Sequence, residues 1–268
     1  MTGNNGRGMV IQERDLHLLR ELSVMRVVDR EQAKIVAEFG STTRVNARLL
    51  ALTRAGLLRR FFLGTTAGGA KALYALSAKG AQLIGVPLRG PQRRKDETLA
   101  ADFFVQHQLT VNQIYCGLKY GTLPPGVSFR QWMSFFAPIA DRLRLIPDGY
   151  VELETPSGLV AAFLEVDLGH ERGPVWGKKI EHYLQFARMS APAGKAFHRP
   201  FRVLVIAPTE RRVRSIRKAV AALTEKIFWF MSLESIHSDG LFAPVWLRPR
   251  GEERLPLIPL VKKPKEIS

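Results

Sequence analysis

The stretch LIPDGYVELETPSGLVAAFLEVDLGHERGPVWGKKIEHYL, residues 145–184, decides the fold of the second half of this sequence. The stretch begins within a β-rich run over residues 143–154 that is interrupted only by Pro147. The turn residues TPSG follow, and a second, mostly apolar run covers residues 159–167. The pattern therefore predicts two strands, a loop and then a helix whose apolar residues recur at spacings of three and four.

The length of the loop sets the register of the two predicted strands. If the loop makes Glu154 face Leu159, the strands pair antiparallel and Asp148 falls opposite Glu165. Side chains directly opposite each other on such a pair lie about 4.5–5.5 Å apart at Cβ. Asp167 is two residues further along, on the same face as Glu165. We therefore expect three carboxylates at one end of an apolar sheet.

Carboxylates gathered in this way repel one another, and a divalent cation would relieve the repulsion. Mg²⁺ and Mn²⁺ prefer oxygen ligands and often use only one or two carboxylates, with water and substrate phosphate completing the shell. The sequence thus predicts Asp148, Glu165 and Asp167 as ligands of Mg²⁺ or Mn²⁺. The alternative is a strand end that reaches solvent, where the carboxylates are hydrated and hold no metal.

The helix after the second strand adds a cation to the predicted site. Trp176, Ile180 and Tyr183 form its apolar stripe, and Lys179 lies at the edge of that stripe. Lys179 can lean over the carboxylates and stabilise charge on a phosphate, which would complete a catalytic set with them. It can equally be an ordinary lysine whose stem covers the edge of a core.

A buried strand over residues 201–207 and a basic helix after it extend this pattern. We expect the outer face of that helix to carry Arg211, Arg212, Arg214, Arg217 and Lys218. These residues are either a solvated face or a track for phosphates. From residue 98 the predicted order is therefore helix, three strands, helix, strand, helix.

The N-terminal part has a different pattern. Helical periodicity covers residues 11–28, 30–38 and 42–55, and two short strands at 57–63 and 71–76 flank a glycine-rich turn. Three short helices followed by a hairpin predict a winged helix-turn-helix, whose third helix enters the major groove of DNA.

The third helix supplies most of the residues that we predict to bind DNA. Val45, Leu49 and Leu52 form its buried stripe. The predicted DNA-binding residues are Thr43, Arg44, Ala47, Arg48 and Arg54 on its outer side, with Arg59 and Arg60 at the start of the wing. Small residues allow close approach to a groove, and arginines reach guanine edges or phosphates. The alternative is a winged helix that contacts only proteins, with its arginines solvated.

The net charge of the chain favours DNA binding over a winged helix that contacts only proteins. The 268 residues carry a net charge of +16 and a pI near 10.5, and residues 1–96 account for +10 of that charge. A strongly basic chain has polyanions as natural partners, so we expect double-stranded DNA rather than a basic surface that serves solubility alone.

Composition excludes several other classes. The only cysteine, Cys116, forms no internal disulfide, and the absence of a Cys/His cluster excludes a zinc site. There is no apolar run of 18 residues and no signal peptide, so we expect a cytoplasmic protein, associated with the nucleoid or a plasmid and not with a membrane.

The predicted domains follow these changes of pattern. They are a loose N-terminus at 1–9, the winged helix at 10–86, a basic linker at 87–97, the second domain at 98–247 and an extended tail at 248–268. The linker assignment rests on two prolines, a glycine and four basic residues within VPLRGPQRRKD.

The second domain resembles the PD-(D/E)XK nuclease superfamily. Pro147-Asp148 looks like its first motif, and Glu165-Val166-Asp167 stands where its (D/E)-X-K would be, with Asp167 in place of the lysine. Some members carry that lysine on the next helix, as Lys179 would be here. The resemblance implies a mixed α and β fold (α+β or α/β), in which a winged helix-turn-helix precedes a mixed-sheet αβββαβα domain.

Residues 10–235, with the run LEVDxGxE…KKIxxY, resemble the bacterial replication-relaxation family. This resemblance implies a DNA-binding protein of a plasmid or other mobile element. Two activities stay open: a nuclease-like domain that nicks or cleaves DNA with a divalent metal, or an inactive one that serves a DNA-binding regulator or a replication or mobilisation accessory protein. A homodimer and other replication or mobilisation proteins are further partners that it allows.

Overall fold

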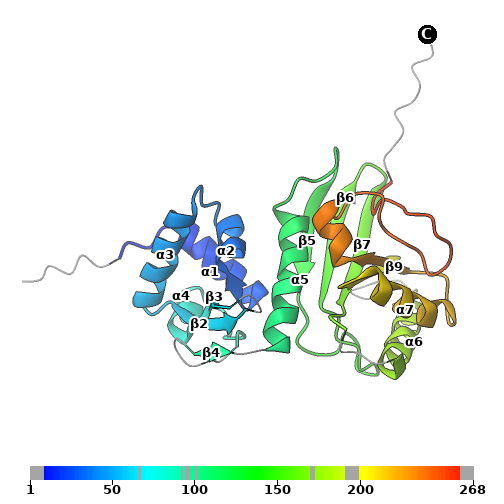
Figure 1. Ribbon diagram of the computed structural model, residues 1–268, viewed down its shortest axis with the longest axis horizontal. Helices are drawn as coiled ribbons and strands as arrows, with labels where there is room; N and C mark the ends of the chain where they lie inside the picture. Colours follow the sequence, from blue (N-terminus) through cyan, green and yellow to red (C-terminus); the bar gives the residue numbers. More distant parts are fainter. Residues whose placement is uncertain are drawn as a thin grey trace, which may run out of the picture. The chain divides into compact units, whose positions relative to one another are not determined.

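The computed structural model describes residues 9–65, 68–91, 93, 97–99, 102–169, 173–190 and 199–259. The chain divides into two compact units, residues 1–116 and 117–268, which we call the N-terminal and C-terminal units (Figure 1). Both mix helices and strands, as the sequence predicts. No described helix is long and apolar enough to cross a bilayer.

Three helices open the N-terminal unit. They are α1 (Glu13–Met25), α2 (Arg30–Val36) and α3 (Thr42–Arg54), and the two-residue strand β1 (Val28–Asp29) precedes α2. The Asp29 carboxylate accepts a hydrogen bond from the Gln32 amide at 2.8 Å and so caps α2. Ser41 caps α3 in the same way. Gly56 follows α3 with φ +76°, a conformation that costs glycine little.

The hairpin of β2 (Leu58–Gly64) and β3 (Ala70–Leu76) follows, and then the short helix α4 (Ala78–Leu83). Strand β1 pairs antiparallel with β3, and β4 (Thr98–Leu99) pairs parallel with β2, so the sheet order is β1-β3-β2-β4. Residues 66–67 at the hairpin tip lie outside the described residues, as do 1–8 and much of the predicted linker.

Most of helix α5 (Phe103–Lys119) belongs to the N-terminal unit, although we expected it to begin the second domain. The buried Asn112 amide donates hydrogen bonds to the carbonyls of Met25 and Val27, at 3.1 and 2.6 Å. The Tyr115 hydroxyl donates to Glu21 at 2.5 Å. Backbone carbonyls at and just after the end of α1 thus accept hydrogen bonds from α5, and this ties α5 to the N-terminal unit.

The C-terminal unit is a five-stranded mixed sheet in the order β5-β6-β7-β8-β9. The strands are β5 (Ser128–Met133), β6 (Gly149–Thr155), β7 (Gly158–Val166), β8 (Phe201–Ala207) and β9 (Phe228–Ser232). Helix α6 (Gly173–Ser190) connects β7 to β8, α7 (Glu210–Ala221) connects β8 to β9, and α8 (Leu233–Ser238) follows β9. The first three strands are antiparallel and the last three parallel.

The predicted register of the central hairpin is confirmed. Gly149 pairs with Leu164, and each further pair as far as Thr155 and Gly158 keeps that register. Gly149 needs to be a glycine, because a Cβ there would lie 2.2 Å from the ring of Trp132 on β5.

Helices α6 and α7 lie side by side against one face of the sheet (Figure 1). Phe163 of β7 is fully buried between them and the strands, with its ring centroid 5.0 Å from those of Tyr150 and Phe201. Two successive crossovers of one hand, β7-α6-β8 and β8-α7-β9, place both helices on this same face.

The described part of the segment predicted as an extended tail packs against the C-terminal unit. Trp246 pairs with Leu255 through backbone hydrogen bonds, and Leu257 and Ile258 are buried. Arg202 of β8 donates to the Leu257 carbonyl. The apolar side chains Leu255, Leu257 and Ile258 anchor this segment despite its prolines and charges. Residues 260–268 lie outside the described residues.

Candidate functional site

Glu165 is the second-to-last residue of β7, and only 1% of it is exposed. Lys179 and Tyr183 lie one turn apart on α6 and face it together. The Lys179 ammonium donates a hydrogen bond to Oε2 at 2.8 Å, and the Tyr183 hydroxyl donates to Oε1 at 2.6 Å. Lys179 thus lies where the sequence predicts it, and both carboxylate oxygens have protein partners.

Burial raises the pKa of Glu165 to about 7, because the charged form is desolvated. The charge of Lys179 opposes this shift, and the negative charge of Asp148 adds to it. Since this pKa lies near neutral pH, both protonation states of Glu165 are populated there.

Asp148 stands just before β6 and next to the end of β7. Its backbone amide donates to the Leu164 carbonyl at 3.0 Å, and its Oδ2 accepts from the Val166 amide at 2.7 Å. These two bonds continue the hairpin by one residue and hold Asp148 beside Glu165. The structure therefore brings together Asp148, Glu165 and Lys179.

Asp167 belongs to a separate cluster. Its carboxylate is 1% exposed and accepts from the Trp176 indole and the Gly169 amide, both at 2.5 Å. Arg212 of α7 completes the cluster with bonds of 3.3 Å from Nε and 2.6 Å from Nη2. Burial acts to raise the pKa of Asp167, but these hydrogen bonds and the Arg212 charge outweigh it and lower the pKa. Asp167 is therefore ionised, and the Arg212 guanidinium neutralises its charge.

Two arginines of α7 differ from the outward orientation that we expected. Arg212 bonds Asp167, and Arg217 is buried. Residues 213, 216, 217 and 220 share one face at helical spacing, so the apolar stripe itself places Arg217 inward. Arg212 flanks the same stripe, but no local pattern indicates that Asp167, 45 positions earlier, is its partner.

The carboxylates predicted as metal ligands are already engaged by protein groups. Both oxygens of Glu165 and both of Asp167 accept hydrogen bonds from protein groups, and one oxygen of Asp148 is bonded to the backbone. An ion at Glu165 would have to bind beside the positive charge of Lys179, on oxygens that already accept hydrogen bonds. Among the described residues no group of three His, Cys, Asp or Glu could hold a metal ion.

The residues predicted to bind DNA fall into three groups in the N-terminal unit. Val45, Leu49 and Leu52 are buried as predicted, so the phase of α3 is correct. Of the predicted residues on α3, Thr43, Arg44, Ala47 and Arg54 are exposed to solvent. Arg59 and Arg60 are half-buried on β2, and the Arg60 guanidinium lies over the ring of Phe62.

Arg48 is the exception on α3. Its guanidinium bonds both carboxylate oxygens of Asp15, with Nε to Oδ1 at 2.7 Å, and the Val10 carbonyl at 2.7 Å. Asp15 is 1% exposed. Arg48 therefore joins α3 to α1, and this position accounts for it without any DNA.

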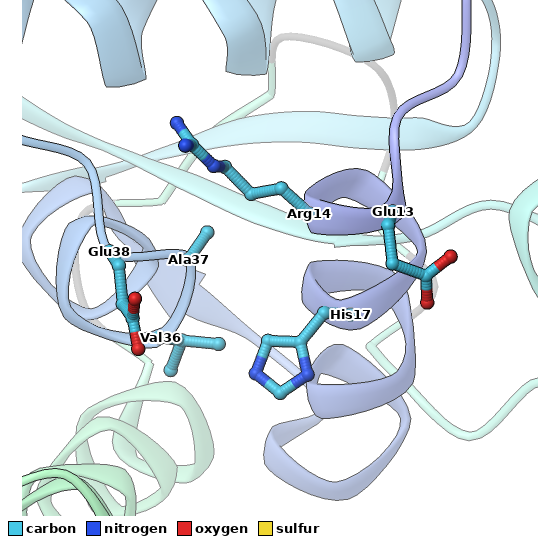
Figure 2. Close-up of a pocket in the computed structure, with 6 residues that line it drawn as sticks. All are labelled: Glu13, Arg14, His17, Val36, Ala37 and Glu38. Atoms are coloured by element: carbon cyan, nitrogen blue, oxygen red, sulfur yellow. The ribbon is translucent and has the colours of Figure 1, made fainter.

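A cavity of about 340 Å³ opens between α1 and the end of α2. Figure 2 shows its lining residues, which are Glu13, Arg14, His17, Val36, Ala37 and Glu38. None of the residues predicted to bind DNA is among them. Charges of both signs line the cavity, so it favours no single class of ligand.

Comparison with protein families matches residues 16–198 to the model described as replication-relaxation. The chain belongs to the replication-relaxation family. No curated protein and no solved structure matches it. The match covers α3 and the residues Asp148, Glu165 and Lys179, whereas Arg212 and the rest of α7 lie beyond it.

Proposed function

We propose that this replication-relaxation protein binds duplex DNA of a plasmid or other mobile element through its N-terminal unit. In this proposal the unit is a winged helix, α3 enters the major groove and the β2–β3 hairpin is the wing. The order of three helices and a hairpin, with β1 added to the hairpin, supports this assignment.

The observation that carries the proposal is the division of α3 into two faces. One face consists of buried aliphatic side chains, and the other exposes Thr43, Arg44, Ala47 and Arg54, with the small Ala47 between the two arginines. A groove-binding helix needs small residues for close approach and arginines that reach guanine edges or phosphates. The net charge of +10 within residues 1–96 favours the same partner.

In the C-terminal unit, we propose a nuclease-like domain without catalytic activity, so that the protein acts as a regulator or as an accessory to replication or mobilisation. Asp167 stands where the nucleases that this domain resembles have lysine, and its charge is neutralised by Arg212. The hydrogen bonds on Glu165 support a structural role for the Glu165–Lys179 pair.

The test is a titration of the full chain with duplex DNA at several salt concentrations. Binding that weakens steeply with salt is expected, because the protein releases counterions from several phosphates. Lack of binding at low salt, or affinity that does not change with salt, would contradict the proposal.

A second candidate function is a divalent-metal endonuclease, and one observation favours it: Asp148, Glu165 and Lys179 do meet. It requires that an ion bind Glu165 beside Lys179 or in its place. Plasmid nicking by the purified protein in Mg²⁺ or Mn²⁺, lost in Asp148→Asn and in Glu165→Gln, would establish it. We expect no nicking, and no rise of the melting temperature with either ion.

A further inference from the structure

Helix α7 carries five basic residues, and the structure separates them into two sets. Arg212 and Arg217 turn inward, as described above. The other three, Arg211, Arg214 and Lys218, are exposed. The family match ends before this helix, so the family gives α7 no assignment.

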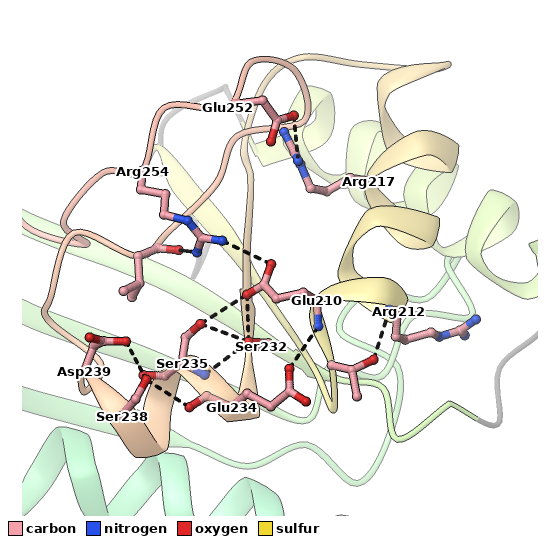
Figure 3. A network of polar contacts seen from close by, with 12 residues as sticks. Glu210, Arg212, Arg217, Ser232, Glu234, Ser235, Ser238, Asp239, Glu252 and Arg254 are labelled. Atoms are coloured by element: carbon pink, nitrogen blue, oxygen red, sulfur yellow. Dashed lines mark hydrogen bonds and ion pairs between the residues drawn. The ribbon is translucent and has the colours of Figure 1, made fainter.

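The inward set serves the fold. Only 7% of the Arg217 side chain is exposed. Its Nε donates to the Arg248 carbonyl at 2.9 Å, a second nitrogen donates to the Gly251 carbonyl, and a third lies 3.4 Å from Glu252 (Figure 3). Arg217 thus holds the segment after β9 against α7.

The one acidic residue of α7 also turns away from the exposed basic side chains. Glu210 accepts hydrogen bonds from the hydroxyls of Ser232 and Ser235 at 2.8 and 3.1 Å, and Arg254 lies 3.2 Å from its other oxygen (Figure 3). The Glu210 carboxylate therefore bonds to residues of β9, of α8 and of the segment near residue 254. No carboxylate of α7 itself balances the exposed basic face.

Arg211, Arg214 and Lys218 lie three and four positions apart, so they share one side of the helix over about 10 Å of its length. Within the part of the chain that the structure describes, none of the three forms an ion pair. Other exposed arginines of this unit do pair with glutamates: Arg130 with Glu154 and Arg250 with Glu225. The exposed face of α7 is thus an uncompensated basic strip.

A cavity of about 500 Å³ begins at one end of this strip. It is lined by Gly169, Pro208, Thr209, Arg211, Arg212 and Ser215. The residues that follow the carboxyl ends of β7 and β8 form part of its wall, an edge where open α/β sheets commonly bind ligands. The exposed guanidinium of Arg211 and the hydroxyls of Thr209 and Ser215 are donors suited to a phosphate group, whereas the Arg212 guanidinium is bonded to Asp167.

We propose that the exposed face of α7 and this cavity form a second DNA-contacting surface, which binds the phosphate backbone of the duplex without reading its sequence. The proposal rests on the proposed function, namely that the protein binds duplex DNA. Arg211 belongs to both the strip and the cavity, and three cations along about 10 Å match a run of neighbouring phosphates.

The experiment compares two triple variants of the full chain with the same net charge. Arg211→Gln/Arg214→Gln/Lys218→Gln removes the strip, and Arg144→Gln/Arg188→Gln/Lys226→Gln removes three exposed cations that do not line the cavity: one before β6, one near the end of α6 and one before β9. Thermal melting verifies that both variants are folded. Binding to two duplexes of unrelated sequence is then titrated from low to moderate salt.

The strip variant is expected to lower the slope of log K against log salt by about 2–3, because each phosphate contact contributes about 0.9. The loss of affinity should be the same on both duplexes, and the control variant should stay close to wild type. An unchanged slope in the strip variant, or equal changes in the two variants, would overturn the α7 surface while leaving the DNA-binding proposal intact. A wild-type protein that binds neither duplex would instead overturn the proposed function, and this surface with it.

Discussion

Helices α3 and α7 belong to different units, yet each turns some arginines inward to protein partners and leaves others exposed. On α3, Arg48 bonds the buried Asp15 while Arg44 and Arg54 remain exposed. On α7, Arg212 bonds the buried Asp167 while Arg211 and Arg214 remain exposed. In both helices the partner, and not the residue type, decides whether an arginine serves the fold or stays available to a phosphate.

The two units differ in how many carboxylates they bury in this way. Asp15 in the N-terminal unit and Glu165 and Asp167 in the C-terminal unit are each 1% exposed, and each meets a cation from a helix. The C-terminal unit thus has two such pairs, and their carboxylates are two residues apart at the end of β7. A buried charge whose partner is removed is costly, so the comparison predicts where substitutions unfold the protein and where they affect only binding.

The largest effect is expected for Arg212→Ala. The substitution leaves the Asp167 carboxylate buried without its cation, which should lower the free energy of unfolding by about 3–5 kcal/mol. Arg211→Ala is the matched control, because Arg211 is adjacent and exposed, and its loss should change stability by less than about 0.5 kcal/mol. Urea denaturation of both variants measures the difference. Equal stabilities would show that the Asp167–Arg212 pair does not support the fold.

Glu165 should make stability depend on pH in a different direction from Asp167. Its pKa is raised from 4.5 to about 7, so between those values the folded state binds more protons than the unfolded state. The contribution of Glu165 to stability is therefore present below pH 4.5 and is lost as the pH rises towards 7. Glu165→Gln should remove this fall, whereas Glu154→Gln, at an exposed position, should retain it.

The measurement is the free energy of unfolding of wild type and both variants between pH 4.5 and 8. The difference between wild type and Glu165→Gln is the quantity of interest, since other groups titrate in all three proteins. A difference that is constant over this range would contradict the raised pKa of Glu165.

Arg48→Ala tests the same rule in the N-terminal unit. We expect a loss of about 3 kcal/mol in the free energy of unfolding, at the lower end for a broken buried pair, because the Gln12 amide still donates to Asp15 at 2.7 Å. At temperatures where the variant is folded, its affinity for DNA should be close to wild type. If the Arg48→Ala variant is as stable as wild type but binds DNA less tightly, Arg48 is a DNA contact after all.

Sequence patterns predicted correctly those features of the structure that residues close together in the chain determine. The register that places Asp148 beside Glu165 follows from one short turn and the alternation of two strands. The phase of α3 follows from its three aliphatic residues. Both are decided within about twenty residues of sequence, and both predictions are confirmed.

Contacts between distant segments were beyond such patterns. The Asp167–Arg212 pair joins residues 45 positions apart, and Asn112 bonds carbonyls more than 80 positions earlier. Basic residues on α7 look alike in the sequence, and only the tertiary packing separates Arg212 and Arg217 from Arg211. For the same reason the sequence predicted a cluster of three carboxylates, whereas the structure places Asp148 beside Glu165 and pairs Asp167 with Arg212.

The smallest effect on stability, and a specific effect on binding, is expected for Arg44→Ala. Arg44 is exposed near the start of α3, and its backbone amide, which the substitution keeps, is what Ser41 caps. The free energy of unfolding should therefore stay within about 0.5 kcal/mol of wild type. If Arg44 reads a base, binding to the preferred duplex should weaken by about 1–3 kcal/mol, and binding to random duplex by less.

Arg20→Ala is the control for Arg44→Ala, because it removes an exposed charge from α1 of the same unit. Equal losses on the preferred and random duplexes would make Arg44 a phosphate contact, equivalent to the exposed residues of α7. A loss no greater than that of Arg20→Ala would mean that α3 does not face DNA. In that case the exposed arginines of α3 and α7 would no longer be comparable, and the strip on α7 would have to account for DNA binding alone.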